Sequence, residues 1–312
     1  MTITQLEYVI AVDNHRHFGR AAESCHVTQP TLSMQINKLE EDLGVKLFDR
    51  DKKPIEPTAV GRRIIDQARI IVAEGGRLRQ LAQEARSTYE GDLRLGIIPT
   101  IAPYLLPRIL DRFRSRFPDV HLIIEEAQTD TIVQKLKLDQ LDAGILATPL
   151  EDKAIIEEPV YYEPFMAFIP EGHRLDGEKF ITNSELSTRD MLLLNEGHCF
   201  RNSVLNLCAE TDPQNDRSRV SLESGNFETL IRLSMKGYGM TLLPYLGALD
   251  LPDRLQQFVR PIADPKPSRE VSVIFSKNQV KVGLIRGLGE VIRNSVPPKL
   301  LEPGKVVSPL RQ

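Results

Sequence analysis

The chain has 312 residues, of which 41% are hydrophobic and 27% charged, and its formal net charge at pH 7 is −3. This balance is typical of soluble globular proteins, and the length allows two or three domains. The small negative charge excludes a protein that binds nucleic acid through its overall charge, so any DNA contact has to come from a local surface. We see no apolar run near the roughly 18 residues of a membrane span and no secretory signal, so we expect a cytoplasmic protein without membrane contact.

The first sixty residues predict three helices that pack on one another. An apolar helical face ends at a break over 13–17, and small side chains in 18–25 let a second helix cross closely. Thr28 is placed to cap a third helix with Pro30 in its first turn, and Gly44 is placed to end it. Apolar residues recur at helical steps on one side of this third helix: Leu32, Ile36, Leu39 and Leu43.

The other side of the third helix carries short polar groups, which can reach base edges and phosphates when a helix lies in the major groove. A basic stretch around Pro54 follows, and we expect it to form a wing against the phosphate backbone of double-stranded DNA. The residues predicted to contact DNA are Gln29, Pro30, Thr31, Ser33, Gln35, Lys38, Arg50 and Lys53. A plain helical subdomain with a polar surface is the alternative interpretation.

A long helix is predicted from Thr58 to about residue 87. Small and apolar residues recur on it at alternating steps of four and three: Ile64, Ala68, Ile71, Gly75, Leu78, Ala82 and Ala85. This spacing is typical of a coiled-coil seam. Two such helices would pair and place two recognition helices on adjacent half-sites, so we expect a homodimer or a homotetramer. The alternative is a single helix packed on its own domain.

From residue 93 strands and helices alternate, which is typical of a parallel α/β fold. The expected strands are 93–98, 120–127, 143–147, 165–169, 191–194, 220–222, 240–243 and 270–276, and the expected helices are 103–117, 129–140 and 280–294. A second α/β unit begins near Pro164, and the last strand and helix return to the first unit. Ligands of such sheets bind beyond the carboxyl ends of strands, where Thr100 and Thr129 lie. Both threonines could instead cap helices.

Cys199 is the most informative reactive group in the sequence. It follows a predicted buried strand and a turn over 195–197, and it therefore falls at a helix N-terminus. There the macrodipole, His198 and Arg201 all favour the thiolate over the thiol. The alternative is a small buried core residue, which is the interpretation we adopt for Cys25 in the second predicted helix.

The spacing of Cys199 and Cys208 predicts a conformational switch. A helix over 200–210 would separate the two cysteines by about 13 Å, whereas a disulfide needs Cα atoms closer than about 7 Å. Oxidation to a disulfide therefore requires the helix to unwind. With only three cysteines in the chain we expect no structural disulfide framework, and the six histidines show no metal-ligand spacing, so we predict no metal and no cofactor.

The N-terminal segments carry a resemblance to a known family. The sequences FGRAA at 18–22 and TQPTLSxQIxKLExxLGVxLFxR at 28–50 resemble the DNA-binding domain of the LysR-type transcriptional regulators. The resemblance extends over residues 1–295, and the segment from His198 to Cys208 is similar to the peroxide-sensing members of that family. It implies a DNA-binding regulator of oxidative-stress genes, an activator and not an enzyme.

The resemblance implies an α+β multidomain fold. A winged helix-turn-helix domain over 1–58 precedes a linker and dimerisation helix over 59–88. An α/β regulatory domain similar to periplasmic binding proteins follows over 89–300, and a flexible tail ends the chain over 301–312. The regulatory domain is expected to contain two subdomains, one over 89–162 and 267–300 and the other over 163–266.

The resemblance also implies roles and partners. Hydrogen peroxide would be held and activated by Thr100, Thr129, His198 and Arg201. Peroxidatic Cys199 would form a sulfenic acid, and resolving Cys208 would convert it to a disulfide. The expected partners are promoter DNA, further copies of the chain, RNA polymerase, and a glutaredoxin or thioredoxin that restores the thiols.

Two other functions compete with this one. The chain could be a LysR-type regulator that responds to a small-molecule effector in the regulatory-domain cleft, with incidental cysteines. It could also be a thiol peroxidase that uses Cys199, although this leaves residues 1–60 unexplained. A count of free thiols before and after stoichiometric peroxide separates the peroxide sensor, which loses two thiols, from the effector-binding regulator, which loses none.

Overall fold

The structure, a computed structural model, describes residues 1–86, 89–208 and 224–309. Its contacts divide the chain into two compact units, Met1–Thr88 with Asn278–Gly283, and Tyr89–Lys277 with Leu284–Gln312. Within the described ranges, no helix has both the length and the apolar character needed to cross a lipid bilayer.

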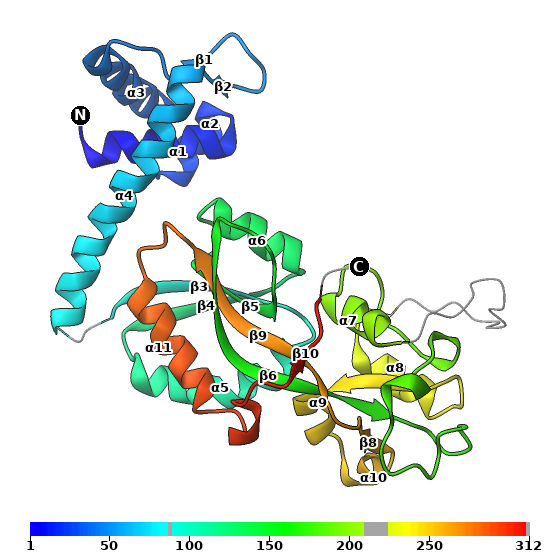
Figure 1. The fold of residues 1–312 in the computed structure, drawn as a ribbon. Helices are drawn as coiled ribbons and strands as arrows, with labels where there is room; N and C mark the ends of the chain where they lie inside the picture. The colour runs from blue at the N-terminus through cyan, green and yellow to red at the C-terminus, as the bar shows by residue number, and fades with distance from the viewer. Residues whose placement is uncertain (87–88, 209–223, 310–312) are drawn as a thin grey trace. The chain divides into compact units, whose positions relative to one another are not determined.

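The first unit contains three short helices, a small hairpin and one long helix (Figure 1). Its elements are α1 (Ile3–His15), α2 (Phe18–Ser24), α3 (Gln29–Leu43), β1 (Phe48–Asp49), β2 (Glu56–Pro57) and α4 (Ala59–Arg86). Strands β1 and β2 pair antiparallel, so the basic segment between them forms the predicted wing.

Side-chain and backbone caps define the helix ends in this unit. Thr2 and Gln5 form a capping box at the start of α1. The Thr28 hydroxyl accepts a hydrogen bond from the Thr31 backbone N–H at 3.4 Å at the start of α3. Gly44 ends α3 with a φ of 70°, in the left-handed region where glycine has no steric penalty. The predicted boundaries of α3 are therefore confirmed.

The apolar side of α3 packs into the core of the first unit. Leu32, Ile36 and Leu39 are fully buried, as predicted. The same prediction is wrong for Leu43, which is 38% exposed. Leu43 is the last residue of α3 and lies outside the core cluster, so the helical repeat continues one turn farther than the surface it packs against.

Helix α4 has a buried beginning and an uncovered middle. Ala68 is buried in the core of the first unit, whereas Ile71 is 36% and Leu78 is 71% exposed. Part of the predicted seam is therefore core, and the next part is an apolar stripe that the single chain leaves open. The side chains of Ala82 and Ala85 lie outside the described residues.

The second unit is an α/β domain. Its strands are β3 (Gly91–Ile97), β4 (Val120–Glu126), β5 (Ala143–Thr148), β6 (Ile155–Phe168), β7 (Thr241–Pro244), β8 (Val259–Pro261), β9 (Pro267–Ser276) and β10 (Lys305–Val306). Its helices are α5 (Ala102–Arg116), α6 (Thr129–Lys137), α7 (Cys199–Leu207), α8 (Phe227–Ser234), α9 (Tyr245–Leu249), α10 (Asp253–Gln256) and α11 (Val282–Arg293), with short 3-10 turns η1 (Asn183–Glu185), η2 (Thr188–Asp190) and η4 (Pro298–Leu300). The predicted alternation of strands and helices is confirmed.

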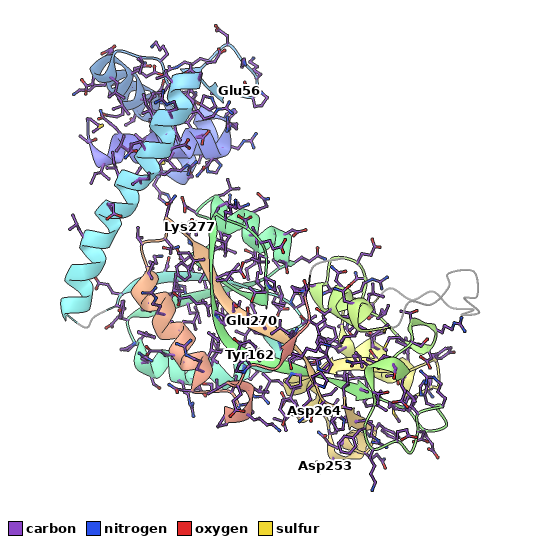
Figure 2. All side chains as sticks on the ribbon, viewed as in Figure 1. Glu56, Tyr162, Asp253, Asp264, Glu270 and Lys277 are labelled. Carbon is purple, nitrogen blue, oxygen red and sulfur yellow. The ribbon has the colours of Figure 1, made fainter. Side chains whose placement is uncertain are left out.

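The sheet has the strand order β4-β3-β5-β9-β6-β7, with β10 on β9 and β8 on β6. Strand β3 is parallel to β4 and β5, but β5–β9, β9–β6 and β6–β7 are antiparallel. Along β6 and β9 the register places Tyr162 opposite Glu270, the two labelled residues at the centre of Figure 2. A parallel arrangement is thus correct for β3, β4 and β5, and it is wrong for the pairs that β6 forms with β7, β8 and β9 and for the pair β5–β9.

Two predicted strands differ from the structure. The predicted strand 165–169 is the end of β6, which begins ten residues earlier at Ile155. Pro159 and Pro164 obscure this strand in the sequence, and the register shifts just after the first of them. The segment 191–194 forms only isolated parallel bridges at its two ends. The predicted strand 220–222 lies outside the described residues.

The C-terminal segment is structured as far as residue 309, so the prediction of a flexible tail is wrong there. Lys305 and Val306 form β10, which pairs in parallel with the start of β9. Val307 is buried in a core cluster of the second unit. A segment this short has no periodicity of its own, and its order comes from a distant strand. Residues 310–312 lie outside the described part.

Candidate functional site

The two cysteines lie at opposite ends of α7. Cys199 is the first residue of the helix, as predicted, and Cys208 follows the last residue in an extended conformation. Both are free thiols. Nine residues of helix correspond to about 13 Å along the axis, so the described conformation is incompatible with a Cys199–Cys208 disulfide.

The turn before α7 fits closely against α6. Gly197 has a φ of 91°, which a side chain would strain. A Cβ atom at this position would lie 2.6 Å from Nε2 of Gln128, the residue that precedes α6. The close approach places the start of α7 beside the start of α6.

The surroundings of Cys199 have opposing effects on its pKa. Burial is the largest and raises the pKa of the thiol above its ordinary value. The positive charge of Arg269, the Thr129 hydroxyl and the backbone N–H groups of Phe200 and Ala147 favour the thiolate and lower the pKa by less. The helix N-terminus contributes through Phe200, as predicted, but the net shift is upward and not downward.

Neither of the two cations predicted to lower the pKa of Cys199 by charge is among the groups that lower it. Arg201 donates a hydrogen bond from Nη1 to the Leu194 carbonyl oxygen at 2.9 Å, and therefore holds the segment that leads into α7. His198 is only 8% exposed, and burial lowers its pKa, so its imidazole is neutral at pH 7. The prediction that these two residues favour the thiolate by charge is wrong, and Arg269 has that role instead.

Arg269 belongs to a buried polar network. Its Nε and Nη2 donate to Glu163 Oε2 at 2.9 and 2.7 Å, and its Nη1 donates to the Thr100 hydroxyl at 3.0 Å. A further bond from Nη2 reaches the Thr100 carbonyl oxygen at 3.0 Å. Glu163 Oε1 accepts the Leu246 backbone N–H at 2.8 Å, and the guanidinium lies 5.2 Å from the centre of the Phe200 ring. The network therefore connects β6 and β9 to Thr100 and to α7.

Sequence reasoning misses Arg269 and Glu163. Glu163 lies in β6, which also carries Glu157 and Glu158, and Arg269 lies in β9 beside Glu270. The side chains of Arg269 and Glu163 are almost completely buried, at 2% and 1% exposure. Charged side chains are rarely buried unless they are paired. Both residues lie just before the predicted strands 165–169 and 270–276, and other charged residues stand near them, so the sequence carries no signal that singles them out.

The two predicted threonines have different neighbours: Thr100 contacts Arg269, and Thr129 lies near the Cys199 sulfur. Thr100 is buried and accepts from Arg269, so its hydroxyl is part of the network. Thr129 is the first residue of α6. Its hydroxyl oxygen is buried without a hydrogen bond of normal geometry among the described residues, although it is near enough to the Cys199 sulfur to lower the pKa of that thiol.

Cys208 lacks, among the described residues, a cation that lowers its pKa. Burial, and to a smaller extent Asp190, raise its pKa to about 11. It packs against the same apolar cluster as Phe200 and Val204 of α7. Cys25 packs against the core of the first unit, and burial raises its pKa too, in agreement with its interpretation as a core residue.

The predicted DNA-binding residues form an exposed surface on α3 and the wing. Gln29, Pro30, Thr31, Lys38 and Lys53 are exposed. Gln35 differs, because its amide oxygen accepts a hydrogen bond from Gln5 of α1 at 3.1 Å. The Gln35 side chain therefore holds α1 and α3 together.

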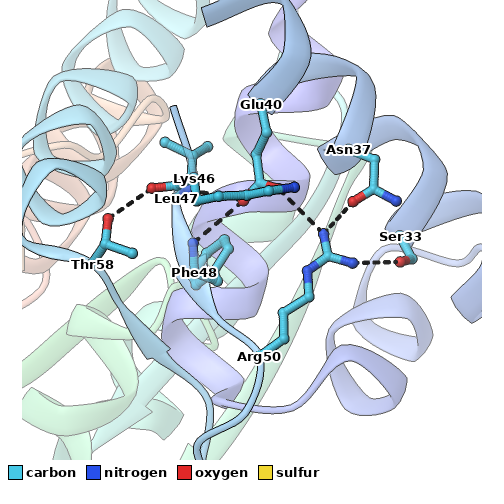
Figure 3. A network of polar contacts seen from close by, with 8 residues as sticks. All are labelled: Ser33, Asn37, Glu40, Lys46, Leu47, Phe48, Arg50 and Thr58. Atoms are coloured by element: carbon cyan, nitrogen blue, oxygen red, sulfur yellow. Dashed lines mark hydrogen bonds and ion pairs between the residues drawn. The ribbon is translucent and has the colours of Figure 1, made fainter. Parts of the chain in front are cut away.

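Arg50 ties the wing to the third helix (Figure 3). Its guanidinium bonds to Ser33 at 3.4 Å and to Asn37, and it lies 3.5 Å from Glu40 Oε2. Glu40 Oε1 also accepts the backbone N–H of Leu47 at 2.8 Å. Glu40 is 2% exposed. Because this buried carboxylate of α3 contacts both Leu47 and Arg50, it fixes the orientation of the wing relative to α3. Its only sign in the sequence is a charge on the apolar side of α3.

Two family models match the chain. A bacterial regulatory helix-turn-helix protein model of the lysR family matches residues 3–62, and a LysR substrate binding domain model matches residues 86–296. The first match removes the alternative of a plain helical subdomain at the N-terminus.

Individual proteins are similar over almost the whole chain. The DNA-binding transcriptional dual regulator OxyR of Escherichia coli K12 is 36% identical over 295 residues, which are 94% of this chain and 95% of that protein. A hydrogen peroxide-inducible genes activator of Haemophilus influenzae is 35% identical and covers 88% of this chain and 90% of its own length.

Solved structures agree with this match. A full-length OxyR variant from Pseudomonas aeruginosa superposes with a TM-score of 0.73 at 34% identity, over 95% of this chain and 99% of its own. A peroxide-bound OxyR variant from Corynebacterium glutamicum gives a TM-score of 0.62 at 25% identity, over 94% of this chain and 92% of its own. The chain therefore belongs to the LysR family of transcriptional regulators and, within it, to the OxyR group.

Proposed function

We propose that this protein is a DNA-binding transcriptional activator that senses hydrogen peroxide through a reversible Cys199–Cys208 switch and controls oxidative-stress genes. The observation that carries the proposal is the position of the two thiols. Cys199 starts α7 within reach of the Arg269 charge and the Thr129 hydroxyl, and Cys208 ends the same helix. The effector-binding alternative gives no role to this arrangement.

In the first step the Cys199 thiolate attacks one oxygen of hydrogen peroxide and the O–O bond breaks. The sulfur becomes a sulfenic acid, and the departing hydroxide takes up a proton to leave as water. Because burial raises the pKa of Cys199, the thiol predominates at neutral pH, and its proton has to leave before or during attack. The Thr129 hydroxyl can donate to the peroxide, and neutral His198 beside Cys199 can accept the thiol proton.

In the second step Cys208 attacks the sulfenic sulfur, the disulfide forms, and the sulfenic oxygen leaves as a second water. This step requires α7 to unwind, because its ends are about 13 Å apart as a helix. The rearranged segment would alter the surface of the regulatory domain and change the spacing of the DNA-binding heads. A dithiol reductant of the glutaredoxin or thioredoxin type would restore both thiols.

The proposal includes an assembly. We assign residues 1–58 to DNA binding, 59–88 to the linker and 89–300 to the regulatory domain, with subdomains over 89–162 and 267–300 and over 163–266. The exposed apolar side chains at Ile71 and Leu78 of α4 support pairing with a second copy as a dimer or tetramer. Promoter DNA is the target, RNA polymerase the activated partner, and the cytoplasm the expected location.

The test measures thiols and DNA binding in the same sample. One equivalent of peroxide should remove two thiols, join Cys199 to Cys208, and change the footprint on a target promoter. A thiol peroxidase would instead consume many equivalents in the presence of a reductant. An unchanged thiol count, with a footprint that responds to a metabolite, would support the effector-binding regulator.

A pair of threonine variants tests peroxide binding. Thr129→Val should slow Cys199 oxidation by about tenfold or more, since one hydrogen bond lost in the transition state is worth about 1.4 kcal/mol. Its melting temperature should hardly change, because the hydroxyl forms no regular hydrogen bond in the described structure. Thr100→Val is the comparison, and it should also lower stability by about 1.5–3 kcal/mol because Arg269 loses an acceptor. A wild-type oxidation rate in Thr129→Val would remove Thr129 from the site.

The DNA surface is tested by separating sequence readout from phosphate contact. Ser33→Ala should reduce discrimination between operator and random DNA by roughly 1–3 kcal/mol. Lys53→Ala in the wing should weaken binding to all sequences alike and lower the salt slope by about one. Titrations at several salt concentrations measure both effects. A changed sequence preference in Lys53→Ala at an unchanged salt slope would show that the wing does not lie on phosphates.

A further inference from the structure

The C-terminal segment 305–309, here called the strap, is anchored on the sheet. Its first two residues form β10 beside β9, as Figure 1 shows, and the Val307 backbone N–H donates to the Ser268 carbonyl oxygen at 2.8 Å. The Val307 side chain is 8% exposed and belongs to the apolar cluster that contains Phe200 and Val204 of α7. The strap and α7 therefore share one core.

Beyond Val307 the strap is bonded directly to α7. The Ser308 carbonyl oxygen accepts from the Asn206 side-chain amide at 3.1 Å and from the Ser203 hydroxyl at 3.4 Å. The Pro309 carbonyl oxygen accepts from the Asn202 side-chain amide at 3.3 Å. All three donors lie between the two cysteines, and their spacing places them on one side of the helix.

We propose that the strap stabilises the helical, reduced form of α7 and thereby sets the redox equilibrium of the Cys199–Cys208 pair. This inference rests on the proposed disulfide. For the disulfide to form, the Cα atoms must come from about 13 Å to within about 7 Å, and no helix over 199–207 can persist. The three donors then lose their common side, and their bonds to the two strap carbonyls break.

The consequence is a linkage between strap docking and oxidation. In a glutathione buffer the protein dithiol reduces one glutathione disulfide, which yields the protein disulfide and two glutathione thiols. Contacts present only in the dithiol form oppose this reaction. Removing the strap should therefore shift the equilibrium constant toward the disulfide, and we expect a shift of about tenfold, which is about 30 mV for this two-electron couple.

The experiment compares the full chain with two truncations. One ends after Pro303 and lacks the strap, and the other ends after Pro309 and keeps it. Each is equilibrated in glutathione buffers, quenched with acid, alkylated, and analysed by mass spectrometry for the Cys199–Cys208 pairing. The shorter chain should be about tenfold more oxidised at equilibrium, and the longer truncation should match the full chain.

Asn206→Ala, made with and without the strap, tests the contact itself. Alanine is the better helix former, so without the strap this change should favour the reduced form slightly. With the strap present it also removes the bond to Ser308, which acts in the opposite direction. The two effects of Asn206→Ala should therefore differ, and their difference measures the coupling of Asn206 to the strap. Equal effects in both backgrounds would contradict the proposed contact.

The unmodified protein supplies a measurement that does not depend on the folding of a truncated chain. The Val307 amide, bonded to Ser268, should exchange its hydrogen slowly in the reduced protein and at least about tenfold faster after oxidation. Equal exchange in the two states, with an unchanged equilibrium in the shorter chain, would overturn the strap proposal. If the full chain forms no Cys199–Cys208 disulfide at all, the proposed function fails instead.

Discussion

Cys199→Ser is expected to abolish the response to hydrogen peroxide while DNA binding stays intact, because a serine hydroxyl cannot form a sulfenic acid and the DNA surface lies in the other unit. Peroxide should then cause neither a loss of two thiols nor a change of footprint. The effect is complete and not graded, since in the described part of the chain only Cys199 combines a helix N-terminus with a cation that lowers the pKa of its thiol. Thiol counting and footprinting before and after peroxide measure it.

Cys208→Ser is the matched variant, because Cys199 keeps its surroundings. The first oxidation step should proceed, and the chemistry should stop at the sulfenic acid for lack of a resolving thiol. A dimedone-type probe should therefore label peroxide-treated Cys208→Ser strongly and Cys199→Ser not at all. A peroxide-dependent footprint in Cys199→Ser would refute the sensor mechanism.

Arg269→Met is expected to cost about 3–5 kcal/mol of unfolding free energy, because it leaves the buried Glu163 carboxylate without its cation. Replacing both residues, as Arg269→Met with Glu163→Leu, should recover most of this loss, because no buried charge is left unpaired. Urea unfolding of the reduced proteins measures both values. Arg286→Met is the control: Arg286 is 62% exposed beside Glu158, and its loss should cost less than about 1 kcal/mol.

The same variants separate stability from reactivity. Arg269 lowers the pKa of Cys199, so removing its charge should raise that pKa further and decrease the thiolate fraction at a given pH. Oxidation should be slower at pH 7 in both the single and the double variant, and the rate profile should move to higher pH. If the double variant recovered both stability and the wild-type rate, Arg269 would be only a structural residue.

Local signals explain which parts of the fold can be predicted. Thr28, Pro30 and Gly44 define α3 by caps that depend on neighbours in sequence, and the structure confirms them. The prediction for Leu43 is wrong because its burial depends on how far the rest of the core extends along the helix. Strand β6 is longer than predicted because Pro159 stands at a register shift, which only the partner strand defines, and Pro164 is accommodated in register opposite Ser268.

In the candidate site, too, the features set by neighbours in sequence can be predicted, and those set by distant strands cannot. The position of Cys199 at the start of α7 follows from the strand, turn and helix pattern around it, and the spacing to Cys208 is a property of the sequence alone. The cation that lowers the pKa of the Cys199 thiol is Arg269 of β9, which is 70 residues away along the chain. Arg201 is only two residues from Cys199, but it donates its hydrogen bond to a backbone carbonyl oxygen. The position of a cation in the sequence therefore does not indicate whether its charge acts on Cys199.

Because Cys208 lies at the far end of an intact helix, the structure of α7 also affects how long the proposed sulfenic acid persists before a disulfide forms. In the proposed mechanism, the sulfenic acid of Cys199 forms the disulfide only when α7 opens, so the opening frequency of this nine-residue helix would set the lifetime of the intermediate. During that interval a second peroxide molecule can carry the sulfur on to a sulfinic acid, which a dithiol does not reverse. Under the proposed mechanism, the stability of α7 would therefore define the highest peroxide concentration at which the oxidation remains reversible.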